Sequence, residues 1–137
     1  MNLKRIITAM LIPLCVACLD VMAHSKTDIV TLFNGDRITG EIKQLDGGIL
    51  VLSTDSMGTV RIEWQEIANL ESEYYFEFQL SNGERLFGSV GEATRPQQLI
   101  VAGLGDEREL EWLEVVRVRA IESNVIDSID AYFSAGY

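Results

Sequence analysis

Acidic side chains that recur at matching places in two parts of the chain are the first candidates for chemistry. The recurring carboxylates are Asp36, Glu63 and Glu66 in the first part and Glu84, Glu111 and Glu114 in the second. Clustered carboxylates can hold a hard cation, and Ca²⁺ in particular prefers carboxyl and carbonyl oxygens. One interpretation is therefore a carboxylate-based cation-binding protein or enzyme.

The local sequence around these carboxylates favours another interpretation. Glu63 and Glu111 fall on the outward side of segments that alternate apolar and polar residues. Asp36 and Glu84 each follow an Asn-Gly pair, where acidic residues suit turns. We therefore expect surface and turn roles, and none of these residues is assigned as a catalytic residue, a cofactor ligand or a metal ligand.

Basic and aromatic residues recur in the same way. Arg37 and Arg85 could bind an anion, but an ion pair with a carboxylate across each hairpin is the simpler expectation. Trp64 and Trp112 could stack on a ligand, yet they continue the inward side of their alternating segments, which favours core packing. The aromatic run at 74–76 is expected to fill a contact between two units rather than recognise a base.

Other catalytic groups are scarce. His24 is the only histidine, and it stands next to a cleavage site described below, so histidine-based general-base chemistry is not expected. The chain contains no Gly-rich phosphate loop, nucleophile elbow or cluster of Cys and His. The sequence therefore predicts no enzyme activity and no cofactor.

Residues 1–23 have the composition of a secretory signal peptide. Two basic residues precede an apolar stretch at 6–17, and small residues ending at Ala23 suit a signal peptidase. A membrane-spanning helix needs about 20 apolar residues, and Asp20 arrives too early for that. We therefore expect a helical, cleaved signal and export to the periplasm or to the periplasmic face of the outer membrane.

The two cysteines lie inside this segment. Cys15 and Cys18 are expected to be ordinary small residues of the signal, and acylation of Cys18 in a lipoprotein is the alternative. Cleavage after Ala23 would leave the mature chain without cysteine, and hence without disulfides or thiolate metal sites.

The mature chain would be strongly acidic. The whole chain has 11 basic and 21 acidic residues, and removal of Lys4, Arg5 and Asp20 leaves 9 and 20, a formal charge of −11. This charge repels phosphate backbones and anionic lipid surfaces. Nucleic acid is therefore not an expected partner, and the acidity most simply serves solubility.

All of the recurring residues belong to one longer repeat. The segment Asn34–Gly40 returns as Asn82–Gly88, and Ile62–Ile67 returns as Leu110–Val115, each displaced by 48 positions. The sequence therefore predicts two tandem units, at 29–72 and 75–123.

Each unit is expected to hold five short strands and one helical turn. The strands of the first unit are predicted at 29–33, 37–45, 49–52, 59–64 and 69–71, with the turn at 65–67. The pair Asn34-Gly35 predicts a tight hairpin, and Gly40 predicts a bend or a close approach of another backbone. This order predicts a small SH3-like or Sm-like barrel, whose closed sheet protects its edges.

The second unit repeats this order with altered loops. Its loop after the second strand is expected to be two residues longer, and its turn after the third strand two residues shorter. Units of this size bury little apolar area alone, and no linker rich in Pro, Gly or Ser separates them. We therefore expect the two units to pack against each other.

Residues 124–137 differ from both units. Small and aromatic residues alternate there, for example Ile129, Phe133 and Tyr137, as in a strand of an outer-membrane β-barrel. One strand cannot form a barrel, and an open edge cannot sit in lipid. The tail is therefore the start of a barrel that continues in a longer protein, an extra strand, or a frayed end.

The motifs of this chain resemble those of a known family. A signal peptide followed by Asn34–Ile42 and then by Ile62–Ile67 is similar to the N-terminal region of YdiY-like proteins, salt-induced outer-membrane proteins of unknown function in Gram-negative bacteria. The similarity covers roughly 29–122, and the tail at 129–137 resembles the opening strand of the barrel in that family. The resemblance implies a periplasmic SH3-like region ahead of an outer-membrane barrel, and it supplies no catalytic residues. The barrel itself is absent from this sequence, so a membrane role stays open.

These observations lead to one functional expectation and one alternative. We expect a non-enzymatic interaction or scaffolding module of the bacterial cell envelope, the N-terminal part of an outer-membrane-associated protein. Its partner would be an envelope protein or an outer-membrane component, and membrane association would come through a continuation of the tail. The alternative is the carboxylate-based cation-binding protein or enzyme, placed in the periplasm.

Overall fold

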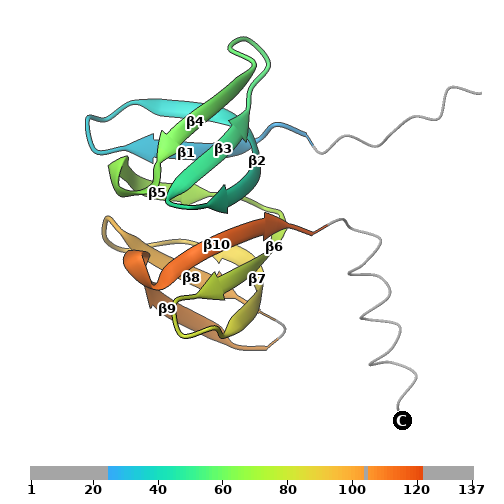
Figure 1. Ribbon diagram of the computed structural model, residues 1–137, viewed down its shortest axis with the longest axis vertical. Helices are drawn as coiled ribbons and strands as arrows, with labels where there is room; N and C mark the ends of the chain where they lie inside the picture. The colour runs from blue at the N-terminus through green and yellow to red at the C-terminus, as the bar shows by residue number, and fades with distance from the viewer. Residues whose placement is uncertain (1–24, 104, 122–137) are drawn as a thin grey trace, which may run out of the picture.

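The computed structural model describes residues 25–103 and 105–121 of the chain (Figure 1). The predictions made for the signal peptide, its two cysteines, His24 and the tail at 124–137 concern residues outside these ranges, and they stay predictions. Within the described ranges, no helix has the length and apolar character needed to cross a membrane.

The described chain is all-β and antiparallel, and its ten strands fall into two sets of five (Figure 1). The first unit contains β1 Asp28–Leu32, β2 Arg37–Asp46, β3 Ile49–Ser53, β4 Thr59–Glu63 and β5 Ile67–Glu71. The second unit contains β6 Tyr75–Leu80, β7 Arg85–Gly91, β8 Gln98–Ala102, β9 Glu107–Glu111 and β10 Val115–Ala120. A 3-10 turn precedes the last strand of each unit, η1 at Trp64–Glu66 and η2 at Trp112–Glu114.

The strands of the two units pair in the same order. In the first unit the order is β5-β1-β2-β3-β4, and in the second it is β10-β6-β7-β8-β9. Even the bulge in the last strand is shared, because the extra residue is Ala68 in β5 and Val116 in β10. The equivalence that the sequence suggests between the two halves therefore extends to these hydrogen-bonded registers, except that β2 has a bulge at Lys43 that β7 lacks.

Apolar alternation explains which side chains are buried. In β3 the buried side chains are Leu50 and Leu52, and in β6 they are Phe76, Phe78 and Leu80, separated in both strands by partly exposed residues. This period of two is that of a strand with one face on the core. The buried residues of both units join into one apolar cluster, so the two units share a core.

Glycine is required where the second strand of each unit crosses the third. A Cβ on Gly40 would lie 2.7 Å from the Ser53 carbonyl oxygen, and a Cβ on Gly88 would lie 2.5 Å from the Ala102 carbonyl oxygen. Real Cβ atoms do not approach a carbonyl oxygen so closely, so both positions require a residue without a side chain. The close backbone approach predicted at Gly40 is confirmed.

Two strand starts of the first unit differ from the prediction, and four of its strand ends differ by one residue. β1 starts at Asp28, one residue early, and that side chain is only 1 % exposed. Its carboxylate accepts the Ile42 backbone N–H at 2.7 Å and the Ser72 hydroxyl at 2.5 Å, and these partners make burial of a polar residue tolerable. β5 starts at Ile67, two residues early, because Ile67 is buried opposite Leu32 as soon as the 3-10 turn ends.

The segment between equivalent core positions, Ile42 to Leu50 in the first unit and Val90 to Leu99 in the second, is one residue longer in the second unit. The turn after β8 is one residue shorter than the turn after β3, so both predicted two-residue differences are wrong. Leu99 lies opposite Leu110 as Leu50 lies opposite Ile62, so Leu99 is equivalent to Leu50. The prediction failed because a continuous apolar run carries no mark of register, and burial of one face decides it instead.

The sheet is not closed, so the predicted closed barrels need correction. Among the described strands, β4 and β9 end the path of paired strands, and neither has a second partner. The far end of β2 pairs with β10, where Leu45 lies opposite Val118. Hydrogen bonding at this point therefore joins the two units into one continuous sheet, and the predicted packing of the units is confirmed.

Candidate functional site

Two tryptophans form the centre of the contact between the units. Trp64 opens η1 and Trp112 opens η2, and both side chains are buried. Their rings stack with centroids 4.0 Å apart and planes 13° apart. Each indole N–H donates to the other residue's carbonyl oxygen, at 2.9 Å from Trp64 and 2.8 Å from Trp112. Core packing is confirmed, but the reciprocal contact was not predicted, although the equal spacing of the two tryptophans was a signal for it.

This reciprocal contact places equivalent residues on opposite sides of the tryptophan pair. The turn between β2 and β3 faces residues 113–117 on one side, which we call the first seam. The loop between β7 and β8 faces residues 65–69 on the other side, which we call the second seam. The two seams can therefore be compared position by position.

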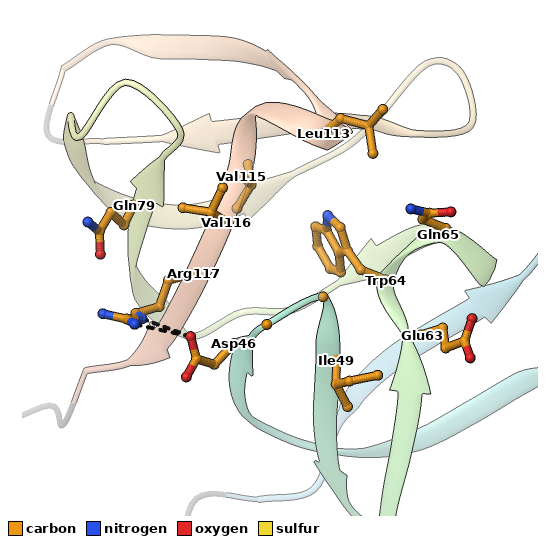
Figure 2. A pocket seen from close by; sticks show the side chains of 12 residues that line it. Asp46, Ile49, Glu63, Trp64, Gln65, Gln79, Leu113, Val115, Val116 and Arg117 are labelled. Atoms are coloured by element: carbon orange, nitrogen blue, oxygen red, sulfur yellow. Dashed lines mark hydrogen bonds and ion pairs between the residues drawn. The ribbon is translucent and has the colours of Figure 1, made fainter.

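The first seam contains an open cleft of about 690 Å³. At one end Arg117 donates to Asp46 Oδ1 at 3.1 Å, beside the pairing of β2 with β10. Figure 2 shows Trp64 inside the cleft, with Val116 on one wall and Ile49 on the other. The other lining residues are Gly47, Gly48, Glu63, Gln65, Gln79, Leu113 and Val115.

The cleft presents large apolar side chains to solvent. Leu113 is 69 % exposed and Val116 is 43 % exposed. The equivalent positions of the second seam hold Gln65 and Ala68. Exposed apolar side chains gathered around one opening mark a surface that a binding partner can cover.

Glu63 brings a negative charge to the cleft. Its side chain is exposed at the end of β4, and no ion pair of Glu63 occurs within residues 25–103 and 105–121. The equivalent Glu111 accepts a hydrogen bond from Arg95 at 2.8 Å. The first seam therefore has the carboxylate without the cation that accompanies it in the second.

The second seam is filled by the loop between β7 and β8. The Gln97 backbone N–H donates to the Ala68 carbonyl oxygen at 2.9 Å. The Gln97 side-chain amide donates to the Gln65 carbonyl oxygen at 3.2 Å. The loop thus bridges the two units where the first seam has an opening.

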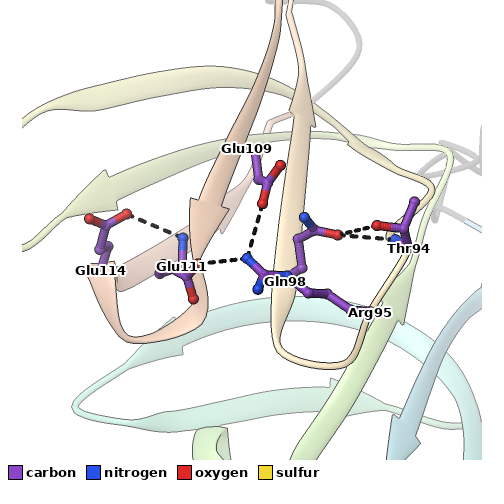
Figure 3. Close-up of polar contacts among 6 residues, drawn as sticks. All are labelled: Thr94, Arg95, Gln98, Glu109, Glu111 and Glu114. Carbon is purple, nitrogen blue, oxygen red and sulfur yellow. Dashed lines mark hydrogen bonds and ion pairs between the residues drawn. The ribbon is translucent and has the colours of Figure 1, made fainter.

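Polar side chains hold this loop in place, as Figure 3 shows. Arg95 Nη2 lies 3.1 Å from Glu109 Oε1 and 2.8 Å from Glu111 Oε1. Gln98 is buried, and its Oε1 accepts the Thr94 backbone N–H at 3.1 Å and the Thr94 hydroxyl at 2.9 Å. The loop is therefore held by its own unit while it contacts the other.

A second groove takes the place of the β2–β10 pairing. The equivalent strands β5 and β7 do not pair in the described sheet, and a groove of about 430 Å³ lies between them. Three carboxylates line it, Glu71, Glu73 and Glu92. One seam thus combines a strand pairing with an open cleft, and the other combines an open groove with a filling loop.

The carboxylates singled out from the sequence lie in turns and on the surface, as predicted. The backbone N–H of Asp36 donates to Asn34 Oδ1, and that of Glu84 donates to Asn82 Oδ1, both at 2.9 Å. Five of the six are exposed, Asp36, Glu63, Glu66, Glu111 and Glu114, and Glu84 is partly exposed. Across the described parts of the chain, no group of three or more His, Cys, Asp or Glu residues could hold a metal ion. The carboxylate-based cation site stays a prediction.

The two recurring arginines form surface ion pairs. Arg85 meets Glu77 across the β6–β7 hairpin at 3.2 Å, as predicted. Arg37 instead reaches Glu71 on β5 at 3.1 Å, because β1 lies between β2 and β5 and both flanking strands are within reach of its face. Neither arginine lines the cleft.

A third arginine alters the titration of a turn carboxylate. Arg108 donates to both oxygens of Glu84, with Nη2 3.0 Å from Oε2. This hydrogen bonding lowers the pKa of Glu84 and raises the pKa of Arg108 from their ordinary values. Both side chains are exposed, and neither lines the cleft.

The aromatic run at 74–76 connects the starts of the two units. Phe76 is buried, and Tyr74 packs against the core from a half-buried position. The Tyr74 hydroxyl donates to the Ser25 carbonyl oxygen at 3.1 Å. Tyr74 and Phe76 also line a small hollow with Glu41 and Ile42 of the first unit, which supports the predicted role in a contact between the units for these two residues.

Comparisons with known proteins reveal no relative. No protein-family model, no curated protein and no solved structure matches this chain. The resemblance to YdiY-like proteins therefore stays a prediction.

Proposed function

We propose that this protein is a non-enzymatic interaction module of the bacterial cell envelope that binds a protein partner in the cleft of the first seam. The observation that carries the proposal is the opening bordered by two exposed apolar side chains, Leu113 and Val116. Full burial of an exposed Val or Leu side chain contributes about 1.5–3 kcal/mol. A partner that covers both side chains would therefore gain a substantial part of its binding free energy there.

The chemistry around the opening suits recognition. The walls of the cleft are apolar, from Ile49, Leu113 and Val116, and the rim around them is polar and includes Glu63 and Gln79. An apolar centre with a polar rim is the usual composition of a protein-binding surface. The volume of about 690 Å³ falls within the range of ligand pockets, so the cleft suits a short segment of a partner.

Each unit is proposed to be SH3-like. The pairing order, the second strand bent at Gly40 or Gly88, and the 3-10 turn before the last strand support this assignment. Fold alone does not identify a ligand. The assignment matters here because it makes the two seams equivalent places in a duplicated architecture.

The proposed location follows from the leader and the resemblance. The signal-like residues 1–23 support export, and the YdiY-like motifs support a place at the periplasmic face of the outer membrane. The partner is then an envelope protein or an outer-membrane component. The negative charge of the chain supports a partner that is not nucleic acid.

Site-specific photocrosslinking in growing cells tests the proposal. A photoreactive amino acid replaces Leu113, and in a control strain it replaces Met57, which is also exposed but does not line the cleft. We expect one envelope protein to be captured at position 113 and not at position 57. Adding Val116→Asp to the first strain should remove that product while the melting temperature stays near that of the native protein.

Two outcomes would contradict the proposal. Capture of the same proteins at positions 113 and 57 would show that contact is not specific to the cleft. Absence of any product at position 113 would show that the cleft has no protein partner under those conditions.

A further inference from the structure

The second seam shows what a segment bound in such a place looks like, because the chain itself supplies one. The loop between β7 and β8 donates a backbone N–H and an amide from Gln97 to the facing unit. Two positions earlier, Arg95 places its guanidinium on Glu111 at the edge of the same seam. The filled seam therefore pairs a basic residue with a second anchoring residue two positions later.

The first seam has equivalent walls and nothing to fill them. Glu63 stands where Glu111 stands, and Leu113 and Val116 stand where Gln65 and Ala68 stand. These equivalences follow from the shared strand registers and the shared bulge. The acceptor positions used by the loop in one seam are thus repeated in the other.

The short glycine turn explains why the first seam is open. Its residues between Asp46 and Ile49 are only Gly47 and Gly48, where the longer loop has Arg95, Pro96 and Gln97. Gly48 and its equivalent Gln97 both have left-handed backbone angles, with φ of 76° and 55°. The path of the chain is therefore similar, and what the first seam lacks is side chains.

The walls of the two seams differ in polarity, and this difference indicates which kind of side chain would fit the first seam. In the second seam the Gln97 amide meets the carbonyl oxygen of polar Gln65. In the first seam that place belongs to Leu113, and the neighbouring alanine is replaced by the larger, exposed Val116. An apolar side chain gains most on these walls, because it removes both residues from water.

We infer that the cleft takes an extended or turn-forming segment of a partner protein that carries a basic residue for Glu63 and, two positions later, an apolar residue for Leu113 and Val116. The inference rests on the proposed function. Arginine fits best at the first position, since its planar guanidinium can form two parallel hydrogen bonds with a carboxylate. The net charge of −10 on the whole chain also favours a basic segment over an acidic one.

Two short peptides test this inference on the full chain. The first has the sequence of residues 92–100 with leucine in place of Gln97, so that it presents arginine and leucine two positions apart. The second is identical except for glutamate in place of the arginine. Binding is followed through the methyl NMR signals of Leu113 and Val116, which report on the cleft directly.

We expect the arginine peptide to shift both sets of methyl signals and to bind about fivefold more tightly than the glutamate peptide, since an exposed ion pair is worth at most about 1 kcal/mol. Glu63→Gln should reduce this preference to near unity. Glu111→Gln is the matched control in the second seam, and it should leave the preference unchanged. Both variants change only an exposed side chain, so melting temperatures near that of the native protein are expected.

The outcomes separate this inference from the proposed function. Equal binding of the two peptides, or no shift at Leu113 and Val116, would overturn the basic, apolar segment. A partner captured at position 113 that is indifferent to Glu63→Gln would also overturn it, while the proposed function would stand. Peptide binding as expected together with no captured partner would count against the proposed function alone.

Discussion

The two seams have the same centre and opposite surroundings. Both are built around the stacked Trp64 and Trp112, whose indole groups donate to each other's backbone. In the second seam the loop that contains Arg95, Pro96 and Gln97 fills the space, and in the first a Gly-Gly turn leaves it open. The difference shows that residues shared by both halves fix the architecture, while a few unshared residues decide which seam has an open cleft.

Truncating either tryptophan removes the stacked pair that both seams share. This change should cause the largest loss of unfolding free energy. Trp64→Ala and Trp112→Ala each delete a buried indole, which costs about 3–5 kcal/mol in unfolding free energy. Because the contact is reciprocal, the two losses measured by urea denaturation should be similar. The double variant should lose less than their sum, since the two rings contact each other. A large loss in one variant only would contradict the equivalence of the seams.

Asp28→Ala should have the next largest effect, because the first unit buries a carboxylate where the second unit buries Phe76. The change leaves the Ile42 backbone N–H and the Ser72 hydroxyl without their acceptor. Hydrogen bonds to a charged group contribute about 1.5–3 kcal/mol, so we expect a loss of about 3 kcal/mol. The control Asp28→Asn keeps one acceptor oxygen and should lose about half as much in thermal unfolding. Native-like stability of the alanine variant would show that these hydrogen bonds contribute little.

Substitutions at the two residues with left-handed backbone angles, Gly48 and Gln97, should change the unfolding free energy less, and by different amounts. Gly48→Ala puts a Cβ on a residue with φ of 76°, which costs about 1–2 kcal/mol. Gln97→Gly relieves that strain but loses the amide hydrogen bond to Gln65, so the net change should stay within about 0.5 kcal/mol. Equal losses in the two variants, measured by the same denaturation, would mean that the turns are not equivalent.

The smallest expected effect on stability concerns the turns of the β1–β2 and β6–β7 hairpins. The hydrogen bonds from Arg108 hold the pKa of Glu84 below its ordinary value, whereas the side chain of the equivalent Asp36 accepts a hydrogen bond from Asn34. The folded Glu84 therefore keeps its charge at lower pH than in the unfolded chain. Its contribution to stability is present above the unfolded pKa and is lost as the pH falls through the lowered folded pKa. Because both side chains are exposed, salt should screen the effect.

Unfolding measured from neutral to acid pH checks this prediction. Glu84→Gln should flatten the acid limb of the stability curve slightly, and Arg108→Gln, which removes the cation instead, should flatten it to a similar extent. An unchanged acid limb in both variants would show that the contact between Arg108 and Glu84 contributes nothing to stability.

Period-two alternation was enough to predict several of the strands and the burial of both tryptophans, whereas β3 and β8 are predicted from continuous apolar runs. It places Trp64 and Trp112 on an inward face but does not say that they meet, since a period carries no information on distance between elements. Asp28 was placed outside the first strand because its partner Ser72 is far along the chain. Polar burial of this kind depends on tertiary neighbours that no local pattern contains.

The cleft was missed for a similar reason. Leu113 and Val116 look like ordinary apolar residues beside the buried Val115, and only the length of the facing turn leaves them exposed. One signal was available in the sequence. At repeated positions the second copy has leucine and valine where the first has Gln65 and Ala68, so an apolar gain on an outward side marked the site.

The reciprocal tryptophan contact has a consequence for how such a cleft can arise. A contact in which each member donates to the same atom of the other is isologous, the kind that holds a symmetric homodimer together. In a homodimer the two seams would have the same sequence. A loop that filled one seam would then fill the other, and a glycine turn would leave both seams open. Placing both halves in a single polypeptide removes that constraint. The second seam can then be filled by its own loop while the first seam keeps an open cleft.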